Sequence, residues 1–197
     1  RNVVEETNRT IGLETGEIDI IYDVGSMDKN KIKEDGRFNL IEAPQARVEY
    51  LGFNVKKKPY DNPKVREAIS YALDQKPIID TVYLGAAEPA TSIIEPKILY
   101  SVEVEKFTQD LEKAKELLKE AGVSNLKLTL AYTSNDPAQK IQATFIQQQL
   151  QAVGINVELR GGDETAIFTE LRKPGSKAYN LFLGGYIMGN DPDLYSK

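Results

Sequence analysis

Apolar residues recur along this chain with two different spacings. Between Asp110 and Gly122 every third or fourth position is apolar, which predicts a helix that buries one stripe. Asp110 is suited to cap the start of this helix and Gly122 to end it. Residues 126–132 instead alternate largely between apolar and polar side chains, the pattern of a strand with one buried face. The stripe of the helix consists of Leu111, Ala114, Leu117, Leu118 and Ala121.

The same two patterns alternate through the rest of the second half. A long helix is predicted after the capping pair Asp136-Pro137, followed by a strand over residues 155–159. A helix capped by Asp163 and a strand over residues 179–186 come next. Because strands that alternate with helices form layered sheets, we predict an α/β fold with helices on the faces of the sheet.

A strand, a turn and a helix are predicted at the centre of the first half. Residues 47–53 end in an apolar, aromatic run that predicts a buried strand. The prolines Pro59 and Pro63 then force a turn, and Asp61 or Asn62 is suited to cap the helix that Pro63 begins. Other elements predicted in this half are a helix from Thr7 or Asn8 to Gly16, strands over 16–22 and 38–42, a helix over 76–83 and an extended loop over 85–100.

Composition places the chain among ordinary soluble globular proteins. It has 197 residues, of which 41% are hydrophobic and 28% charged, so it is long enough for a sizeable core. Its net charge of −5 leaves no excess of cations for phosphates and argues against a nucleic-acid partner. The run Lys56-Lys57-Lys58 is better explained as a solvated turn than as a binding patch.

The chain contains neither cysteine nor histidine. This removes disulfides, thiolate chemistry, the commonest general base and the commonest transition-metal ligand. We therefore expect no cofactor. No run approaches the roughly 20 apolar residues of a membrane span, and the sequence, which begins with Arg1 rather than Met, contains no signal peptide. We expect the chain to be an excised or processed piece of a longer protein.

Motifs for catalysis are missing, whereas two loops are placed well for binding. The sequence has no Gly-x-Ser-x-Gly, phosphate-binding loop or Gly-x-Gly-x-x-Gly motif. Carboxylate pairs such as Asp191 and Asp193 would suit a two-carboxylate hydrolase or a hard cation, but capping and solvation explain them better. In open α/β sheets, ligands bind beyond the carboxyl ends of the strands. The candidate loops there are Thr133-Ser134-Asn135, which also suits helix capping, and residues 185–190.

The stretch from Phe53 to Asp74 resembles a family signature. It contains Phe53-Asn54, a short basic link, Pro59-Tyr60-Asp61-Asn62 and Val65-Arg66 before Asp74. This pattern is similar to that of the extracytoplasmic solute-binding proteins of peptide and nickel ABC importers. The helix over 110–122 and Gly16-Glu17-Ile18-Asp19 also match that family. The resemblance implies that residues 1–197 form one ligand-binding lobe of a type II periplasmic-binding-protein-like fold with a mixed sheet, and that the other lobe is absent.

The resemblance also implies a way of holding a ligand. In peptide-binding members, the strand after the glycine that Gly185 matches pairs with the peptide backbone, and a following acid holds the peptide amine. Here Gly189 stands at the position of that acid, so we predict that acetylating a peptide's amino terminus weakens binding little. The two loops at the strand ends and the resemblance together give these candidate ligand-binding residues: Thr133, Ser134, Asn135, Phe168, Arg172, Gly185, Tyr186, Ile187, Met188, Asn190 and Asp191.

The function implied is transport without covalent chemistry. We expect an extracytoplasmic protein, in the periplasm or anchored as a lipoprotein, that delivers oligopeptides to the permease subunits of an ABC importer. The alternatives are a non-peptide cargo, such as a chelated metal or a sugar, and a two-carboxylate hydrolase domain.

Overall fold

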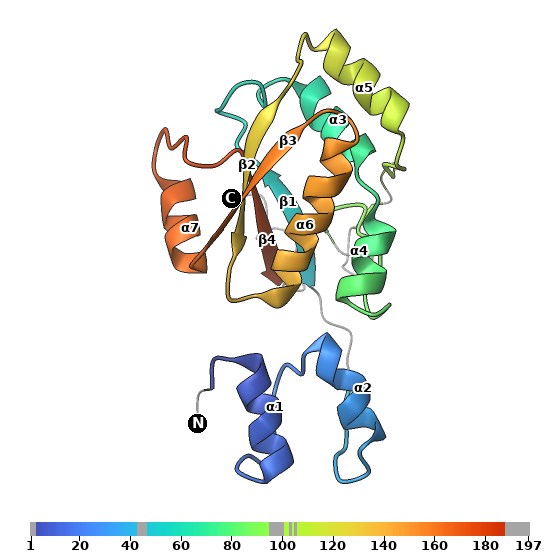
Figure 1. Ribbon diagram of the computed structural model, residues 1–197, viewed down its shortest axis with the longest axis vertical. Helices are drawn as coiled ribbons and strands as arrows, with labels where there is room; N and C mark the ends of the chain where they lie inside the picture. Colours follow the sequence, from blue (N-terminus) through green and yellow to red (C-terminus); the bar gives the residue numbers. More distant parts are fainter. Residues whose placement is uncertain (1–2, 43–46, 95–100, 103, 105, 188–197) are drawn as a thin grey trace.

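The structure is a computed structural model that describes residues 3–42, 47–94, 101–102, 104 and 106–187. Within them, four strands form one mixed sheet in the order β1-β4-β2-β3 (Figure 1). Strand β2 runs parallel to both β3 and β4, whereas β1 is antiparallel to β4 at the edge. The strands are β1 (Arg47–Phe53), β2 (Lys127–Thr133), β3 (Asn156–Gly162) and β4 (Leu181–Ile187). The predicted α/β class and mixed sheet are confirmed.

Helices cover the two faces of this sheet unequally. Side chains alternate along β4, so that Leu181 and Leu183 face one way and Phe182 the other. The first face carries α3 (Pro63–Ala72), α4 (Gln75–Val82), α5 (Leu111–Glu120) and α6 (Pro137–Gln151), and the second carries α7 (Glu164–Arg172).

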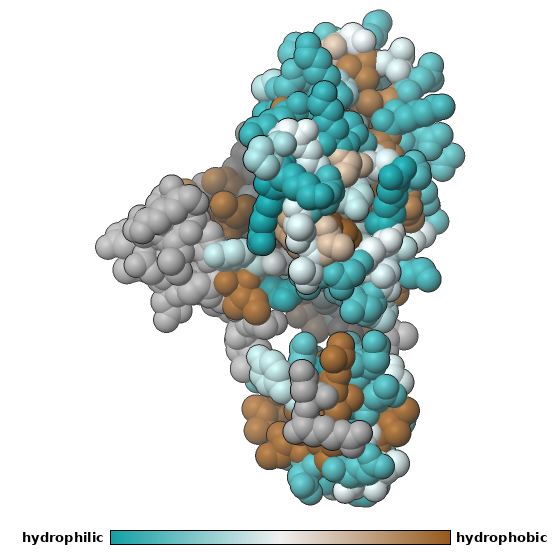
Figure 2. Space-filling view, turned by 90° about the vertical axis from the view of Figure 1, so that its left-hand side faces the viewer, coloured by the Kyte–Doolittle hydropathy of each residue, from teal (hydrophilic) through white to brown (hydrophobic). Residues whose placement is uncertain are grey.

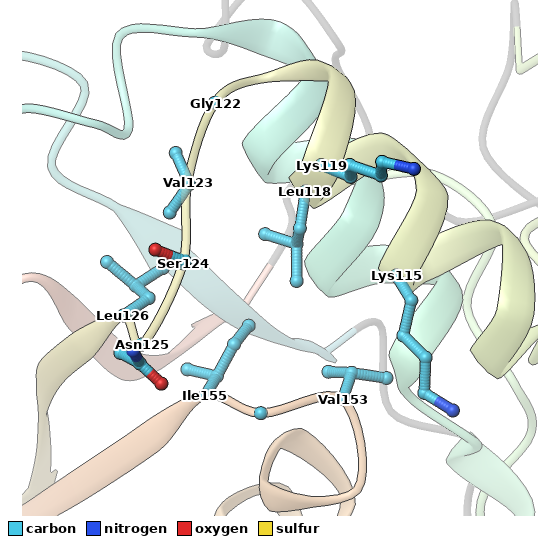
Figure 3. A pocket seen from close by; sticks show the side chains of 11 residues that line it. Lys115, Leu118, Lys119, Gly122, Val123, Ser124, Asn125, Leu126, Val153 and Ile155 are labelled. Atoms are coloured by element: carbon cyan, nitrogen blue, oxygen red, sulfur yellow. The ribbon is translucent and has the colours of Figure 1, made fainter.

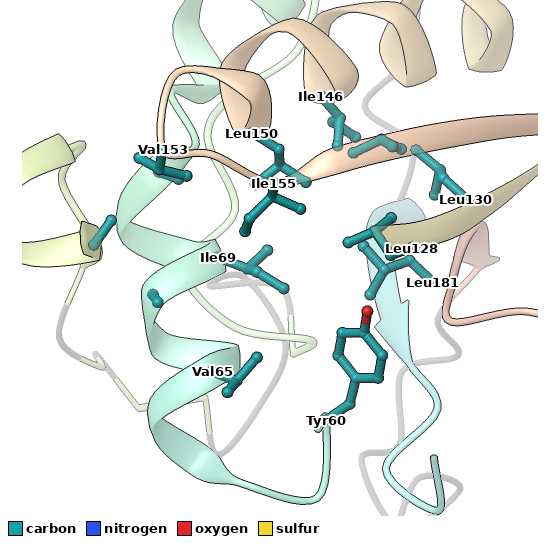
Figure 4. Packing of buried hydrophobic residues seen from close by; sticks show 14 of the residues in the cluster. Tyr60, Val65, Ile69, Leu128, Leu130, Ile146, Leu150, Val153, Ile155 and Leu181 are labelled. Atoms are coloured by element: carbon teal, nitrogen blue, oxygen red, sulfur yellow. The ribbon is translucent and has the colours of Figure 1, made fainter. Parts of the chain in front are cut away.

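The main core lies between the sheet and the larger helical layer. Val65 and Ile69 of α3 point toward Leu128 and Leu181 of the sheet, and Leu150 of α6 closes the cluster (Figure 4). Each of these five side chains is buried. The apolar stripes and alternating strands predicted from the sequence therefore meet in one core.

Most predicted helix caps are confirmed. Asn62 accepts a hydrogen bond from the Lys64 backbone N–H at the start of α3. Asp74, one of the polar signature residues, caps α4, while Arg66 donates to the carbonyls of Tyr60 and Asp61. These signature residues therefore have structural roles. The predicted caps of the later helices accept as expected: Asp110 from Lys113, Asp136 from Gln139 and Asp163 from Ala166.

The first forty residues form a separate helical part. Helices α1 (Glu6–Thr15) and α2 (Ser26–Glu34) lie beneath the sheet in Figure 1. Leu13 and Ile32 are buried there, yet no described residue of this part belongs to the main core. Gly16 ends α1 in the left-handed conformation, with φ of 77°, as the sequence predicts.

Two predicted strands and one predicted cap are wrong. Residues 16–22 and 38–42 form no strand, because neither segment has a partner strand among the described residues. Ile20 and Ile41 accordingly stand 85% and 83% exposed. Helix α1 begins at Glu6, one residue before the first predicted cap, and Glu5 at its N-cap makes no side-chain hydrogen bond.

None of the helices in the described ranges is long and apolar enough to cross a membrane.

Candidate ligand-binding site

The carboxyl ends of three parallel strands meet at one edge of the sheet. Strand β2 ends at Thr133, β3 at Gly162 and β4 at Ile187, and the antiparallel β1 begins beside them at Arg47. Helices α6 and α7 start directly after β2 and β3, so their N-terminal N–H groups lie at the same edge. We call this the carboxyl edge. It is where open α/β sheets hold their ligands.

In the first predicted loop, Thr133 and Ser134 form hydrogen bonds with neighbouring elements of the fold. Thr133 is buried, and its backbone N–H donates to Gln139 Oε1 at 2.8 Å. Ser134 donates its N–H to the carbonyl of Gly162 at 2.9 Å, and its hydroxyl donates to the same oxygen at 3.2 Å. Asn135 is exposed beyond them. Thr133 therefore ties the end of β2 to α6 and Ser134 ties it to β3, while Ser134 and Asn135 are both exposed to solvent.

The second predicted segment lies on a strand with one unpaired side. Strand β4 pairs with β1 along its whole length but with β2 only through Leu181 and Phe182. Strand β2 meanwhile stays paired with β3 as far as Thr133. From Leu183 to Gly185, the side of β4 that faces β2 thus has no ladder partner among the described residues. The two strands diverge toward the carboxyl edge and leave main-chain groups available for an added strand.

Glycines on β4 make room for the side chains of β1. A Cβ at Gly184 would lie 2.7 Å from ring atoms of Tyr50, its partner in the register. A Cβ at Gly185 would lie 2.4 Å from Arg47 Nη2 and 2.6 Å from Glu49 Oε1. These glycines are thus explained by close packing across the strands rather than by a kink.

Beyond the glycines, the strand presents large apolar side chains to solvent. Tyr186 is 45% exposed and Ile187 58% exposed, although both pair with β1. The structure therefore brings Gly185, Tyr186 and Ile187 to the same edge as the Thr133 loop. The remaining predicted residues of this segment, Met188, Asn190 and Asp191, lie outside the described residues, as does Gly189.

The two predicted residues of α7 are placed differently. Phe168 packs edge-on against Phe182, with ring centroids 5.9 Å apart, and the Arg172 guanidinium lies 5.8 Å from the Phe168 ring. Helix α7 starts at the carboxyl edge, so Arg172 at its last turn is about 13 Å along the helix from that edge. Phe168 thus helps to dock α7 on the sheet, and the structure brings Arg172 to Phe168 but not to the Thr133 loop or to Gly185.

A partly exposed ion pair that the sequence analysis missed stands at the start of β1. Arg47 Nε donates to Glu49 Oε1 at 2.5 Å, and Glu49 Oε2 is buried with no hydrogen-bond partner among the described residues. Burial raises the pKa of Glu49, against the opposing effect of Arg47. Burial likewise raises the pKa of Tyr83 to about 12, so this phenol stays neutral. The signal for the pair was present, because residues two apart on a strand share a face.

Neither a metal-binding cluster nor the cavity between the α5–β2 and α6–β3 connections points to a different ligand site. The described residues contain no group of three or more acidic, histidine or cysteine side chains that could hold a metal ion. A cavity of about 350 Å³ lies between the α5–β2 and α6–β3 connections, floored by Leu118, Val153 and Ile155 and flanked by Lys115 and Lys119 (Figure 3). It opens at the amino ends of β2 and β3, opposite the carboxyl edge, so the geometry that favours ligand binding in α/β sheets does not apply to it.

Comparison with known proteins identifies the family. Residues 1–196 match the family model described as bacterial extracellular solute-binding proteins, family 5 middle. The chain belongs to this family. Its members are the substrate-binding components of ABC importers, and the relatives found are solute-binding proteins rather than enzymes.

Individual relatives bind different cargoes. The chain is 34% identical over 179 residues to the glutathione-binding protein GsiB of Escherichia coli, covering 90% of this chain and 35% of GsiB. It thus spans about a third of the length of the curated relatives it matches. The ABC transporter substrate-binding protein CtaP of Listeria monocytogenes superposes with a TM-score of 0.91 at 34% identity, over 100% of this chain and 41% of CtaP.

Two further solved structures were determined with cargo. DppA of Helicobacter pylori, in complex with the peptide STSA, has a TM-score of 0.83 at 30% identity, over 98% of this chain and 37% of DppA. NikA of Staphylococcus aureus, in complex with Ni(L-His)2, has a TM-score of 0.79 at 25% identity, over 92% and 39% of the two chains. The fold is therefore that of the type II binding proteins, and the family by itself does not fix the cargo.

Proposed function

We propose that this chain is one lobe of a two-lobed extracytoplasmic protein that delivers oligopeptides to an ABC importer. The peptide would lie in extended form along β4, as an added strand on the side that faces β2, enclosed when the second lobe closes over it. The observation that carries this proposal is the side of β4 that faces β2 from Leu183 to Gly185, where no ladder to β2 is formed within the described part of the chain. The kinship with DppA and GsiB supports a peptide-like cargo.

Strand addition gives the site a definite chemistry. Main-chain hydrogen bonds supply affinity, and alternate side chains of the peptide face pockets, so such sites tolerate varied sequences. The exposed side chains of Tyr186 and Ile187 lie on opposite faces of β4 and would add apolar contact to the two faces of the added peptide strand. No covalent step is part of this function, and no cofactor is needed for it.

N-methylation of the peptide backbone tests the proposal in the full-length protein. A methyl group on an amide that donates to β4 removes a hydrogen bond worth about 0.5–1.5 kcal/mol and adds a clash, so affinity should fall at least tenfold. Methylation one residue along, on an amide that points away, is the matched control. Calorimetry measures the affinities. Equal losses of affinity on methylating successive amides of the peptide would contradict strand addition.

The amino terminus of the peptide supplies a second test. The family's usual acid is replaced by Gly189. Acetylating one good ligand should therefore change its affinity little, whereas a charge-assisted anchor worth about 1.5–3 kcal/mol would produce a loss of tenfold to a hundredfold. A hundredfold preference for the free amine would show that another acid, such as Asp191 or one in the second lobe, holds the amine.

The second candidate is a chelated metal, which the kinship with NikA favours. Mass spectrometry of the ligand that co-purifies with the full-length protein distinguishes the two cargoes. Incubation with a peptide mixture also separates binding from hydrolysis, because a binding protein returns its ligand intact and a two-carboxylate hydrolase yields fragments. Recovery of intact peptides is the expected result.

A further inference from the structure

A group of lysines gathers at the end of the sheet opposite the carboxyl edge. Strand β1 ends there at Phe53 and its partner β4 begins there at Leu181, so the flanking segments 54–62 and 170–180 lie at the same end (Figure 1). The sequence analysis explained the run 56–58 as a solvated turn. The structure places three further cations at its end of the sheet. We call the two segments the basic end, and its cations are Lys56, Lys57, Lys58, Arg172, Lys173 and Lys177.

Hydrogen bonds hold the two segments of the basic end together. Asn54 Nδ2 donates to the carbonyl of Ser176 at 3.1 Å, and the Asn54 backbone N–H donates to the carbonyl of Asn180 at 3.0 Å. Lys57 Nζ donates to the carbonyl of Lys177, 120 residues further along the chain, at 2.9 Å. The fold therefore fixes the lysines of the turn beside those of the loop after α7.

The basic end holds few acids to balance these charges. Its six cations are accompanied by two acids, Asp61 and Glu170, and Glu170 pairs with Lys173. The rest of the chain has nine more acids than cations, so this end stands apart from a protein whose net charge is −5. Like charges held close together repel one another, and an anionic partner removes that repulsion.

The basic end faces solvent and lies away from the proposed cargo site. Lys56, Lys58 and Lys177 are exposed. Seen from the side of α7, the upper part of the molecule shows mostly hydrophilic side chains, in contrast to the apolar surface of the lower part that contains α1 and α2 (Figure 2). A partner that binds the basic end therefore leaves the carboxyl edge uncovered.

We infer that the basic end docks the protein on a membrane surface of anionic phospholipid. Anionic lipid headgroups attract clusters of about four to eight lysine and arginine side chains, the size of the cluster found here. Binding to such surfaces combines this attraction with burial of apolar side chains, and Val55, which is 51% exposed, lies in the same turn. The inference depends on the extracytoplasmic location proposed above, whereas the nature of the cargo does not enter it.

Sedimentation of the full-length protein with lipid vesicles, using protein prepared without a lipid anchor, tests the inference. The protein should bind vesicles that contain phosphatidylglycerol and should not bind vesicles of phosphatidylcholine alone. Binding should weaken as salt is added, because exposed charges are screened over about 8–10 Å at physiological ionic strength. No binding to the anionic vesicles, or equal binding to both kinds, would overturn the inference.

Substitutions assign the binding to the basic end. Each lysine near an anionic membrane strengthens binding about fivefold, so the double variant Lys58→Glu, Lys177→Glu should weaken it at least about twentyfold. The matched control Lys33→Glu, Lys106→Glu makes the same change of net charge at exposed lysines outside the basic end. It should weaken binding less than about threefold, because distant charges are screened. Equal losses in the two variants would show that net charge alone is responsible and would overturn the inference.

Further measurements separate this role from folding and from cargo binding. Both double variants should unfold at the temperature of the native protein. If charge reversal lowers that temperature, the milder pair Lys58→Gln, Lys177→Gln should still weaken vesicle binding about tenfold. Cargo affinity should be unchanged in the basic-end variant, so the vesicle result and the proposed function can fail independently. Impaired delivery of cargo in cells with unchanged vesicle binding would identify an acidic protein as the partner and overturn the inference.

Discussion

At the scale of single residues, the pairing of β4 with β1 depends on two glycines, at positions where a side chain would collide with residues of β1. Gly184 lies under the ring of Tyr50, whereas Gly185 lies under the flexible ends of Arg47 and Glu49. The rigid ring has less room to move than the ionic side chains. The two positions therefore differ in what a methyl group would do.

Gly184→Ala should destabilise the protein by about 1–3 kcal/mol, the usual effect of overpacking. Gly185→Ala should have the smaller effect, because the ends of Arg47 and Glu49 can rotate away. Urea unfolding of both variants measures the two free energies. Equal losses would mean that the ring of Tyr50 yields as easily as the ion pair.

At Tyr60 we expect the opposite effect, because removing its hydroxyl group should not reduce the stability of the protein. Its side chain is fully buried at the foot of the core in Figure 4, and its hydroxyl has no hydrogen-bond partner among the described residues. An unsatisfied buried polar group costs about 1–3 kcal/mol. Tyr60→Phe should thus leave the free energy of unfolding unchanged or raise it, in the same urea experiment. A clear loss of stability would reveal a hidden partner for the hydroxyl.

Glu49 should make stability depend on pH with an unusual sign. Burial raises its pKa in the folded state, so the folded protein keeps this proton at pH values where the unfolded chain has released it. In that window the folded state binds more protons, and stability falls as pH rises.

The stability of the native protein relative to Glu49→Gln should therefore decline as pH rises from below the ordinary pKa of a glutamate through the raised value. Paired urea titrations across this range check it, since other titrating groups cancel in the difference. Glu170 is the control of opposite sign, because hydrogen bonds from Lys173 and Ser176 lower its pKa. A difference that rises with pH for Glu49 would show that Arg47 outweighs burial.

At the scale of elements, the junction of β4 with β2 is short and relies on one side chain. Only two residue pairs join these strands within the described residues. Asn180, just before β4, is buried, and its Oδ1 accepts from both the backbone N–H and the hydroxyl of Thr129, at 2.8 and 2.9 Å. This side chain fixes where β4 leaves β2, and so where the unpaired side begins.

Asn180→Ala should cost about 1–3 kcal/mol, because it removes the acceptor of two partly buried donors of Thr129. Asn156→Ala, at an exposed asparagine that begins β3, is the matched control and should have little effect. The free energy of unfolding from urea titrations compares them. Similar losses at both positions would mean that Asn180 does not hold the junction.

At the scale of the whole molecule, the proposed cargo site would form one wall of a cleft. The carboxyl edge presents β4, the Thr133 loop and the starts of α6 and α7, but the second wall would come from the other lobe. Full-length proteins that bind near micromolar gain about 8 kcal/mol. Without the second wall, the ligand remains partly hydrated and many contacts are missing.

The 197-residue chain should therefore bind the cargo of the full-length protein at millimolar affinity or weaker. Calorimetry with the same peptide measures both proteins. The chain should still unfold cooperatively through its main core, so that weak binding cannot be attributed to a lost fold. Similar affinities for the two proteins would contradict the two-lobed arrangement.

The sequence alone determined the elements whose signals are local. Caps such as Asn62, Asp110 and Asp136 satisfy N–H groups within three residues, and apolar stripes such as that of α5 need only a helix to form. The carboxyl edge followed from the order of strands and helices, because parallel strands must end on one side. The family followed from the polar residues of the signature.

Tertiary structure decided what depends on neighbours distant in the chain. Residues 16–22 have the pattern of a strand, yet a strand exists only where a second one supplies hydrogen bonds, and the described residues offer none. The unpaired side of β4 likewise arises because β2 diverges after Ala131, which no local pattern records. Arg172 lies away from the Thr133 loop and Gly185, because α7 runs from the carboxyl edge toward the other end of the sheet. Local signals act over a few residues, whereas strand pairing and helix direction are set by the packing of the whole chain.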